Sequence, residues 1–258
     1  MAGMKLYFSP GACSLSPHIA LREAGLEFEL ERVDFATKQT RGGEDFMAIN
    51  PKGLVPTLRL DSGETLTEGP AIVQYIADLR PDSGLAPAAG TFARYRLQEA
   101  LNFISTELHK PFAALFHKEC PDSWKEVVKT KLAAALAEVD ATLSRQPFLL
   151  GDSFTVADGY LFTVANWTRY VGLTLDTWPH LAAFVGRIAE RPAVHAALEA
   201  EGLLRARKIK DFLVVALRRA DGTWHYNPEE HEPLTLGMTI IFMGSPAARV
   251  ALERLLVP

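Results

Sequence analysis

Residues 4–33 read MKLYFSPGACSLSPHIALREAGLEFELERV, and this stretch sets the topology of the first domain. Its opening, residues 4–8, is typical of a short apolar strand, which a Ser-Pro-Gly turn connects to a helix. We expect Ser16 to be the N-cap of this helix, Pro17 to be its first residue and Gly25 to end it. An alternating segment then closes the stretch. The order strand, helix, strand predicts a parallel pair of strands joined by a right-handed crossover.

The following segments extend this pair of strands to a larger sheet. Residues 57–60 and 65–67 flank an Asp-Ser-Gly-Glu turn, which predicts a β-hairpin, and residues 68–79 have a helical pattern. Together these elements predict a four-stranded mixed sheet with helices packed on it. Residues 81–90 contain two Pro and two Gly and lack an apolar period, so we expect a linker there, after a first domain at residues 1–80.

Beyond the linker the strand patterns stop and apolar residues recur at helical spacing. The five helical segments expected are 91–116, 124–143, 156–170, 181–190 and 194–204. Thr155 and Asp158 have the spacing of a capping box, which marks the start of the third segment, although Asp replaces the usual Glu or Gln. These patterns predict an all-α second domain at residues 91–208.

Residues 209–258 return to strand patterns. We expect strands at 212–217, 223–226 and 238–243, the first two joined by an Ala-Asp-Gly turn, and a final helix at 245–256. This segment is therefore a short α+β tail that is rich in strands. The predicted fold class of the whole chain is α/β plus all-α, followed by that tail.

The composition excludes several classes of function. The 258 residues include 27 Lys and Arg against 31 Asp and Glu, a net charge of −4, so there is no basic excess that would bind nucleic acid or an anionic membrane. The apolar runs are far shorter than the roughly 18 residues of a membrane span, and no signal peptide is visible. Two cysteines are too few for a disulfide framework, and we expect a cytoplasmic protein.

Cys13 is the first candidate for chemistry. It lies between a predicted strand and a predicted helix, where the helix dipole favours an anion, so we expect a lowered thiol pKa. The spacing Cys13-Ser14-Leu15-Ser16 is a Cys-x-x-Ser motif, in which a mixed disulfide at the cysteine would await an external thiol. Taken alone, Cys13 could equally be a small buried apolar side chain.

Two further motifs suit a short peptide ligand. Val55-Pro56 precedes a strand, and a cis proline there would leave the Val55 backbone free to pair with an extended peptide, although an ordinary turn proline is the alternative. Glu68-Gly69 stands at a helix start, where backbone N–H groups and a carboxylate would bind an α-amino acid end group. The alternative is that Glu68 only complements the helix dipole.

Asn102, Thr106 and His109 form one polar stripe on the first helix of the second domain. Such a stripe beside an apolar one faces an interface or a cleft. His109 could donate to a thiolate or act as a general base, while a structural role is the alternative. His109, His117 and Cys120 could also be read as metal ligands, but a proline interrupts the helix and no second ligand pair follows, so we expect no metal.

Together these motifs resemble those of the bacterial beta-class glutathione S-transferases, from residue 4 to about residue 208. The segments that carry the resemblance are 4–7, 10–18, 50–56, 67–69, 101–103 and 108–110. The resemblance implies a thioredoxin-like domain that binds glutathione, an all-helical domain that forms most of the electrophile site, and a homodimer.

The resemblance also assigns roles in the first domain. It implies that Cys13 lies against the glutathione sulfur and that Lys38 faces the glycine carboxylate. It implies that Val55 pairs with the cysteinyl backbone, and that Glu68 and Gly69 hold the γ-glutamyl end.

In the helical domain the resemblance implies that Asn102, Thr106 and His109 approach the bound tripeptide. Thr106 departs from the Ser associated with that position but keeps a hydroxyl. Phe116 and Trp167 are candidates for the electrophile pocket, because aromatic walls suit flat apolar ligands, although each could be a core residue instead.

The activity implied is conjugation of glutathione to hydrophobic electrophiles, with Cys13 and His109 as catalytic residues. Cys13 would also support a glutaredoxin-like thiol transfer. The alternative is a non-catalytic glutathione- or ligand-binding protein, or a redox sensor with a regulatory tail. We favour the enzyme because the thiol and the Glu68 helix terminus are both retained.

The tail resembles a different family. Segments 214–219, 221–222, 226–228 and 236–244 look like the latter half of the regulatory C-terminal (RCK-C) domain of potassium channel and TrkA-type proteins. In that family the domain dimerises and can bind small effectors, but the first half is missing here. A three-stranded sheet with an unpaired edge has too little core alone, so we expect it to pack on the transferase domain or on another copy.

Overall fold

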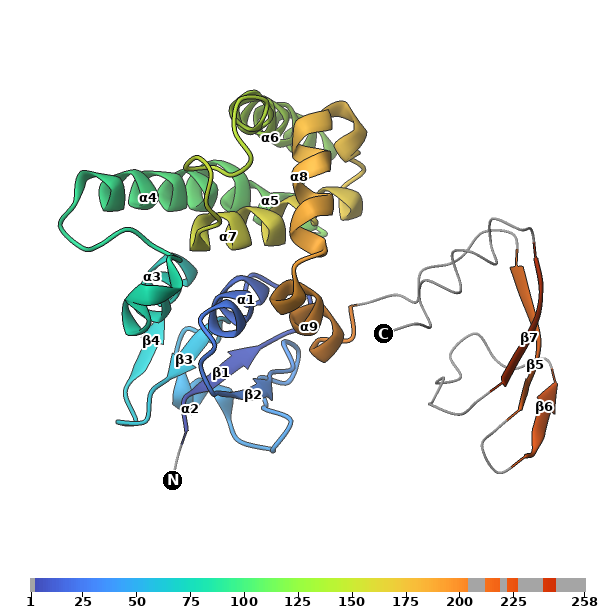
Figure 1. The fold of residues 1–258 in the computed structure, drawn as a ribbon. Coiled ribbons are helices and arrows are strands. Elements are labelled where there is room, and N and C mark those ends of the chain that lie inside the picture. Colours follow the sequence, from blue (N-terminus) through green and yellow to red (C-terminus); the bar gives the residue numbers. More distant parts are fainter. Residues whose placement is uncertain (1–2, 204–211, 219–221, 227–238, 245–258) are drawn as a thin grey trace. The chain divides into compact units, whose positions relative to one another are not determined.

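The structure is a computed structural model of the 258-residue chain. It describes residues 3–203, 212–218, 222–226 and 239–244 (Figure 1). The chain forms two compact units, one up to residue 204 and one from residue 205 onward. The first unit contains a sheet region followed by a helical region, and the second contains a small sheet.

The sheet region has four strands in the order β2-β1-β3-β4. Their bounds are Lys5–Phe8 (β1), Glu29–Arg32 (β2), Thr57–Arg59 (β3) and Thr65–Thr67 (β4). β1 pairs in parallel with β2 and antiparallel with β3, which is hairpin-paired with β4. Leu6 lies opposite both Leu30 and Leu58 in this register, and it is fully buried. The predicted parallel pair and hairpin are therefore confirmed.

Three helices accompany the sheet: α1 (Leu15–Glu23), the short α2 (Phe46–Ile49) and α3 (Gly69–Leu79). α1 contacts α3 and also packs against the helices α7 and α9 of the helical region (Figure 1). It is buried from Leu15 to Leu21, as expected for a helix covered on several sides. Gly25, with φ 62°, follows the end of α1 as predicted.

The predicted N-cap of α1 is wrong by two residues. Ser14, not Ser16, is the N-cap, and the helix begins at Leu15. The Ser14 hydroxyl exchanges hydrogen bonds of 3.2 Å with the backbone of Ser9, which closes the preceding turn early. Pro17 is tolerated at the third helical position because the first N–H groups of a helix have no intrahelical acceptor.

The helical region is all-α, as predicted. Its long helices are α4 (Phe92–Phe103), α5 (Lys110–Phe116), α6 (Asp122–Leu143), α7 (Val156–Ala165), α8 (Pro179–Ala189) and α9 (Pro192–Ala200). The short turns are η1 (Pro81–Ser83), η2 (Ile104–His109), η3 (Thr168–Tyr170) and η4 (Leu175–Thr177). Every residue of α7 is buried, which makes it the central helix of this region. None of the described helices combines the length and apolar composition that a membrane crossing requires.

Helix α7 begins with the predicted capping box. The Asp158 carboxylate accepts from the Thr155 N–H at 2.8 Å and from the Thr155 hydroxyl at 2.9 Å. It also accepts from the Leu149 N–H at 2.8 Å. The helix predicted to run over residues 156–170 ends at Ala165, and the short turn η3 follows.

The single helix predicted over residues 91–116 is interrupted. η2 is a π-helical segment, and the N–H of Lys110 donates to the carbonyl of Ser105, five residues back. We attribute this widening to Pro111, which has no N–H and whose ring clashes with the carbonyl four residues earlier in a regular α-helix.

The second unit has a three-stranded antiparallel sheet in the order β6-β5-β7. Its strands are β5 (Phe212–Arg218), β6 (Trp224–Tyr226) and β7 (Thr239–Gly244), close to the predicted ones. The register of β5 shifts between Val214 and Ala216, which marks a β-bulge. The helix predicted at 245–256 lies outside the described residues.

Candidate active site

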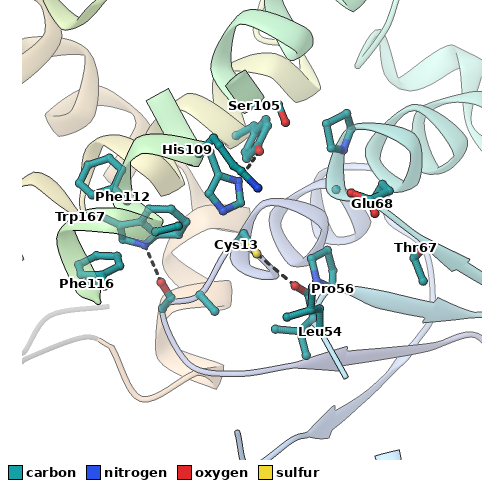
Figure 2. Close-up of a pocket in the computed structure, with 18 of the residues that line it drawn as sticks. Cys13, Leu54, Pro56, Thr67, Glu68, Ser105, His109, Phe112, Phe116 and Trp167 are labelled. Atoms are coloured by element: carbon teal, nitrogen blue, oxygen red, sulfur yellow. Dashed lines mark hydrogen bonds between the residues drawn. The ribbon is translucent and has the colours of Figure 1, made fainter. Parts of the chain in front are cut away.

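A cavity of about 680 Å³ lies where the sheet region meets the helical region. Its floor comes from the loop after β1, the segment before β3 and the start of α3, and its roof from η2, α5, α7 and η3. In Figure 2, Glu68 and Thr67 lie at one end, and Phe112, Phe116 and Trp167 gather at the other. Cys13 and His109 lie between the two ends.

Cys13 lines the pocket just before α1, and its thiol donates to the carbonyl of Val55 at 3.2 Å. Burial raises the pKa of the Cys13 thiol to about 11. The backbone N–H groups of Cys13 and Ser14 oppose this effect, and the charge of Glu68 adds to it. The predicted lowering of this pKa is therefore wrong, because desolvation outweighs the helix N-terminus. At neutral pH Cys13 is a protonated hydrogen-bond donor.

The peptide bond between Val55 and Pro56 is cis, which decides between the two alternatives left open by the sequence. Asn50 braces this segment, because its side-chain amide donates to the carbonyl of Leu54 at 2.9 Å and to the hydroxyl of Thr57 at 3.0 Å. The carbonyl of Val55 is thereby held toward Cys13.

Glu68 has a φ of 70°, a conformation that a residue other than glycine rarely adopts. It is the N-cap of α3, and its carboxylate is 3.0 Å from the Nζ of Lys52. Gly69 begins the helix and lines the pocket with Glu68 and Lys52. Lys52 was not among the predicted site residues, although it stands inside the motif of residues 50–56. Carboxylate, ammonium and helix N-terminus form a charged end of the pocket.

Lys38 does not line the pocket. Its Nζ donates to the carbonyl of Gly53 at 3.0 Å and lies 5.5 Å from the centroid of the Phe35 ring. Asn102 and Thr106 are exposed and also do not line the pocket. The Thr106 hydroxyl donates to the carbonyl of Asn102 at 3.1 Å. The structure therefore brings His109 into the pocket without the other two members of its predicted stripe.

His109, at the end of η2, has its Nδ1 2.6 Å from the hydroxyl of Tyr160. Its ring meets that of Trp167 edge to face, with centroids 4.9 Å apart. Burial lowers the pKa of His109, the neighbouring charge of Lys110 lowers it further, and Glu68 opposes both. The imidazole is therefore neutral at pH 7.

The other end of the pocket is aromatic. Phe112 stacks on Phe116 with centroids 5.6 Å apart, and Trp167 meets Phe112 edge to face at 5.4 Å. Phe116 is half-exposed, whereas Trp167 is buried and its indole N–H donates to the carbonyl of Gly11 at 2.8 Å. Phe112 was not among the predicted site residues, although it lies four residues before Phe116 and hence on the same helix face.

The loop that carries Cys13 is also held from α9. The N–H of Gly11 donates to a Glu201 carboxylate oxygen at 2.9 Å, and the other oxygen lies 2.8 Å from Nδ1 of His18. Arg22 donates to Nε2 of His18 at 2.8 Å. The side chains of His18 and Glu201 are both fully buried. Sequence reasoning could not find this chain of contacts, because Glu201 and Gly11 are 190 residues apart.

Comparisons with known proteins agree with this geometry. Residues 11–79 match the family model of the glutathione S-transferase N-terminal domain, and residues 103–192 match that of the C-terminal domain. "Glutathione S-transferase GstA" of Escherichia coli O157:H7 is 48% identical over 200 residues, which cover 78% of this chain and 100% of that protein. The chain belongs to the glutathione S-transferase family.

Solved glutathione S-transferases share the fold. The structure described as "Ternary complex of BphK, a bacterial GST" is 58% identical, with a TM-score of 0.76 over 77% of this chain and 100% of that one. A sphingomonad glutathione S-transferase complexed with glutathione is 52% identical, with a TM-score of 0.75 over 77% of this chain and 99% of that one. The sheet region is thus the thioredoxin-like domain of a glutathione S-transferase, and the helical region is its C-terminal domain.

Proposed function

We propose that this protein conjugates glutathione to hydrophobic, aromatic electrophiles. The observation that carries the proposal is the layout of the pocket: a charged end at Glu68, an aromatic end at Phe116 and Trp167, and two hydrogen-bond donors between them at Cys13 and His109 (Figure 2). Glutathione has an α-amino acid group at one end and a thiol in its middle. The order of groups along the pocket therefore matches the order of groups along glutathione.

The charged end would bind the γ-glutamyl group. Glu68 would pair with the ammonium, while Lys52 and the N–H groups at Gly69 would bind the carboxylate. The backbone N–H of the glutathione cysteine would donate to the carbonyl of Val55 and displace the Cys13 thiol from it. Cys13 would then be free to donate to the glutathione sulfur.

The two donors would stabilise the glutathione thiolate once its proton has left to water. The thiolate would attack an electrophilic carbon held against the wall of Phe116 and Trp167, and the leaving group would depart with the bonding electrons. Lys110, which also lines the pocket, adds a positive charge to it. We therefore infer a preference for flat aromatic electrophiles, including those that carry an anionic group.

Thiol transfer is a second candidate activity, favoured by the Cys-x-x-Ser motif. The Cys13 thiolate would attack the glutathione sulfur of a mixed disulfide and release the other thiol, and a second glutathione thiolate would regenerate Cys13 and leave as oxidised glutathione. With a pKa of about 11, only on the order of 1 in 10,000 Cys13 side chains is a thiolate at pH 7. We therefore rank conjugation above thiol transfer.

We also infer a cytoplasmic homodimer. Asn102 and Thr106 are exposed and lie outside the pocket of their own chain. If they contact glutathione, as the resemblance implies, they must reach it from a second copy.

Lys38 would face the glycine carboxylate only if its bond to the Gly53 carbonyl opens.

We propose that the domain boundaries are those predicted from the sequence. These are 1–80 for the glutathione-binding domain, 81–90 for the linker, 91–208 for the helical domain and 209–258 for the tail. Within the described part of the tail, β6 and β7 are the outer strands of the sheet. We propose that the tail is a partial RCK-C domain that contacts another surface through such an edge.

The proposal is tested by incubating the protein with oxidised glutathione and mapping any adduct by mass spectrometry, with Cys13→Ala to exclude Cys120. Reduced glutathione and a chloronitrobenzene electrophile are then supplied together. We expect glutathione to raise the melting temperature and the conjugate to form at a rate that saturates with both substrates. A thermal shift without conjugate would overturn the proposal and support a non-catalytic glutathione-binding protein, and no shift and no conjugate would overturn glutathione binding as well.

A further inference from the structure

Tyr160 lies in the wall of the pocket, but the proposed chemistry gives it no role. It stands on the fully buried helix α7 and is itself only 2% exposed. Its hydroxyl is 2.6 Å from Nδ1 of His109, and the nearby side chain of Ser105 opposes the rise that burial causes in the pKa of Tyr160. Ser105 and His109 both belong to the π-helical segment η2. The bond between Tyr160 and His109 therefore joins the buried helix α7 to an imidazole in the pocket.

The direction of the bond between Tyr160 and His109 follows from the acidity of the two groups. A phenol is a stronger acid than a neutral imidazole, and an imidazole nitrogen is a stronger base than a phenol oxygen. The short bond is therefore O–H to nitrogen, with Tyr160 donating and Nδ1 accepting.

This direction determines where the proton of His109 lies. A neutral imidazole carries one N–H, and if Nδ1 accepts, the proton must be on Nε2. The edge-to-face contact with Trp167 holds the ring plane, and Figure 2 shows the imidazole lying over Cys13. Nε2–H is thus the ring donor that faces the middle of the pocket.

We propose that Tyr160 is a positioning residue that keeps His109 in its Nε2–H form, so that His109 acts as a hydrogen-bond donor to the glutathione sulfur and not as a general base. The inference rests on the proposed function, because it assigns the sulfur as the acceptor. Its structural half, the proton position on His109, stands without any bound ligand.

The first test reads the proton position directly. Nitrogen-15 chemical shifts of labelled histidine distinguish a ring nitrogen that carries a proton from one that accepts a bond. The signals of His109 are assigned by their loss in His109→Gln, since the chain has 7 histidines. We expect a protonated Nε2 and an accepting Nδ1 in the full-length protein, and a mixture of the two forms in Tyr160→Phe. A protonated Nδ1 in the wild type would overturn the inference even if glutathione conjugation is confirmed.

The second test is a double-mutant cycle on kcat/KM. The amide nitrogen of His109→Gln approximates the position of Nε2 and is always a donor, whereas that of His109→Asn approximates Nδ1. We expect Gln to retain more activity than Asn. Tyr160→Phe should lower kcat/KM about tenfold in the wild type, the value of roughly one hydrogen bond, with little change in KM for glutathione. In the His109→Gln background it should cost almost nothing, since an amide has no second tautomer.

Tyr95→Phe is the matched control, because Tyr95 is 59% exposed on α4 and does not line the pocket. An equal loss from Tyr160→Phe in both backgrounds would show that Tyr160 only supports the fold, and would overturn the proposal. Absence of conjugation in the wild type would instead refute the proposed function, and the nitrogen-15 spectra would still decide the proton position.

Discussion

Cys13 illustrates how burial changes the chemistry of a single residue. The sequence correctly places it between a strand and a helix, and that position does supply two N–H groups that lower its pKa. The sequence does not show how far folding removes this partly buried thiol from water, and this desolvation has the larger effect. An argument from the helix dipole alone therefore has the wrong sign at a buried site.

The raised pKa predicts how Cys13 reacts with alkylating agents. Because burial raises this pKa to about 11, the thiolate fraction should rise tenfold for each pH unit from 7 to about 10. We expect the rate of alkylation by iodoacetamide, followed at Cys13 by peptide mass spectrometry, to rise in the same way. An alkylation rate that levels off near pH 8 would contradict the raised pKa of Cys13. Cys13→Ala serves to identify the signal from Cys120.

Asp158 gives a pH dependence of stability with a defined sign. Burial raises its pKa from 3.8 to about 6, so the folded protein binds this proton more tightly than the unfolded chain does. The contribution of protonated Asp158 to the free energy of unfolding is therefore present below about pH 4 and is lost as the pH rises to about 6. Relative to Asp158→Asn, we expect the wild type to lose about 3 kcal/mol across this window, measured by urea unfolding. A difference that does not change with pH would refute the assignment.

At the scale of elements, the sequence predicted which segments are strands and helices better than it predicted where they break. The hairpin at β3 and β4 and the capping box of α7 depend on neighbouring residues, and both were found. The π-helical segment was missed, although Pro111 was visible as an interruption. A proline shows that a helix must adapt, but the packing around it decides between a break, a kink and a wider turn.

Pro111→Ala tests whether the wider turn serves the site. Restoring the N–H should favour a regular α-helix through η2, which would rotate Ser105 and His109 relative to Tyr160. We expect kcat/KM to fall at least about tenfold, with the melting temperature unchanged or higher. Pro192→Ala, at the start of α9, is the control and should leave kcat/KM unchanged. Unchanged kinetics for Pro111→Ala would show that the π-helical turn is dispensable.

Glu201, just after α9, should matter for both stability and glutathione binding. Glu201→Gln removes the carboxylate that accepts from the N–H of Gly11 and from Nδ1 of His18, and the loss of a hydrogen bond to a charged group typically costs about 1.5–3 kcal/mol. We expect that loss in urea unfolding, together with a higher KM for glutathione, since Gly11 loses an acceptor. Glu199→Gln, an exposed neighbour, should change neither quantity. A loss below about 1 kcal/mol would mean that the contact between Glu201 and His18 contributes little to the free energy of unfolding.

At the scale of the whole molecule, the sequence predicted both domains, and the family resemblance implied a site formed by both, but several residues that line the cavity were not predicted. The periodicity of apolar residues shows which face of a helix is buried, but not which other helix or strand packs against that face. Tyr160 reads as one more buried residue of an apolar helix, and Lys52 as part of a loop. Their place in the pocket follows from how α7 and the residue 50–56 segment pack, which no local pattern encodes.

The two compact units predict the effect of truncation. Residues 1–204 form a unit of their own, and a relative of the same family is matched over its full length by 78% of this chain. We therefore expect a protein that ends at residue 204 to fold and bind glutathione with an affinity within about twofold of the full chain, as measured by calorimetry. A truncated protein that is unfolded by circular dichroism would show that the tail supports the transferase unit.

The carbonyl of Gly11 accepts from the indole N–H of Trp167, and the N–H of Gly11 donates to Glu201, so side chains from two distant segments fix the two peptide groups on either side of this residue, close to Cys13. Phe116, in contrast, is half-exposed at the end of α5. Substitutions at the aromatic rim can therefore alter which electrophiles fit, while the sulfur site keeps its geometry. A chain built this way can diversify its substrate range over evolutionary time without first losing its chemistry.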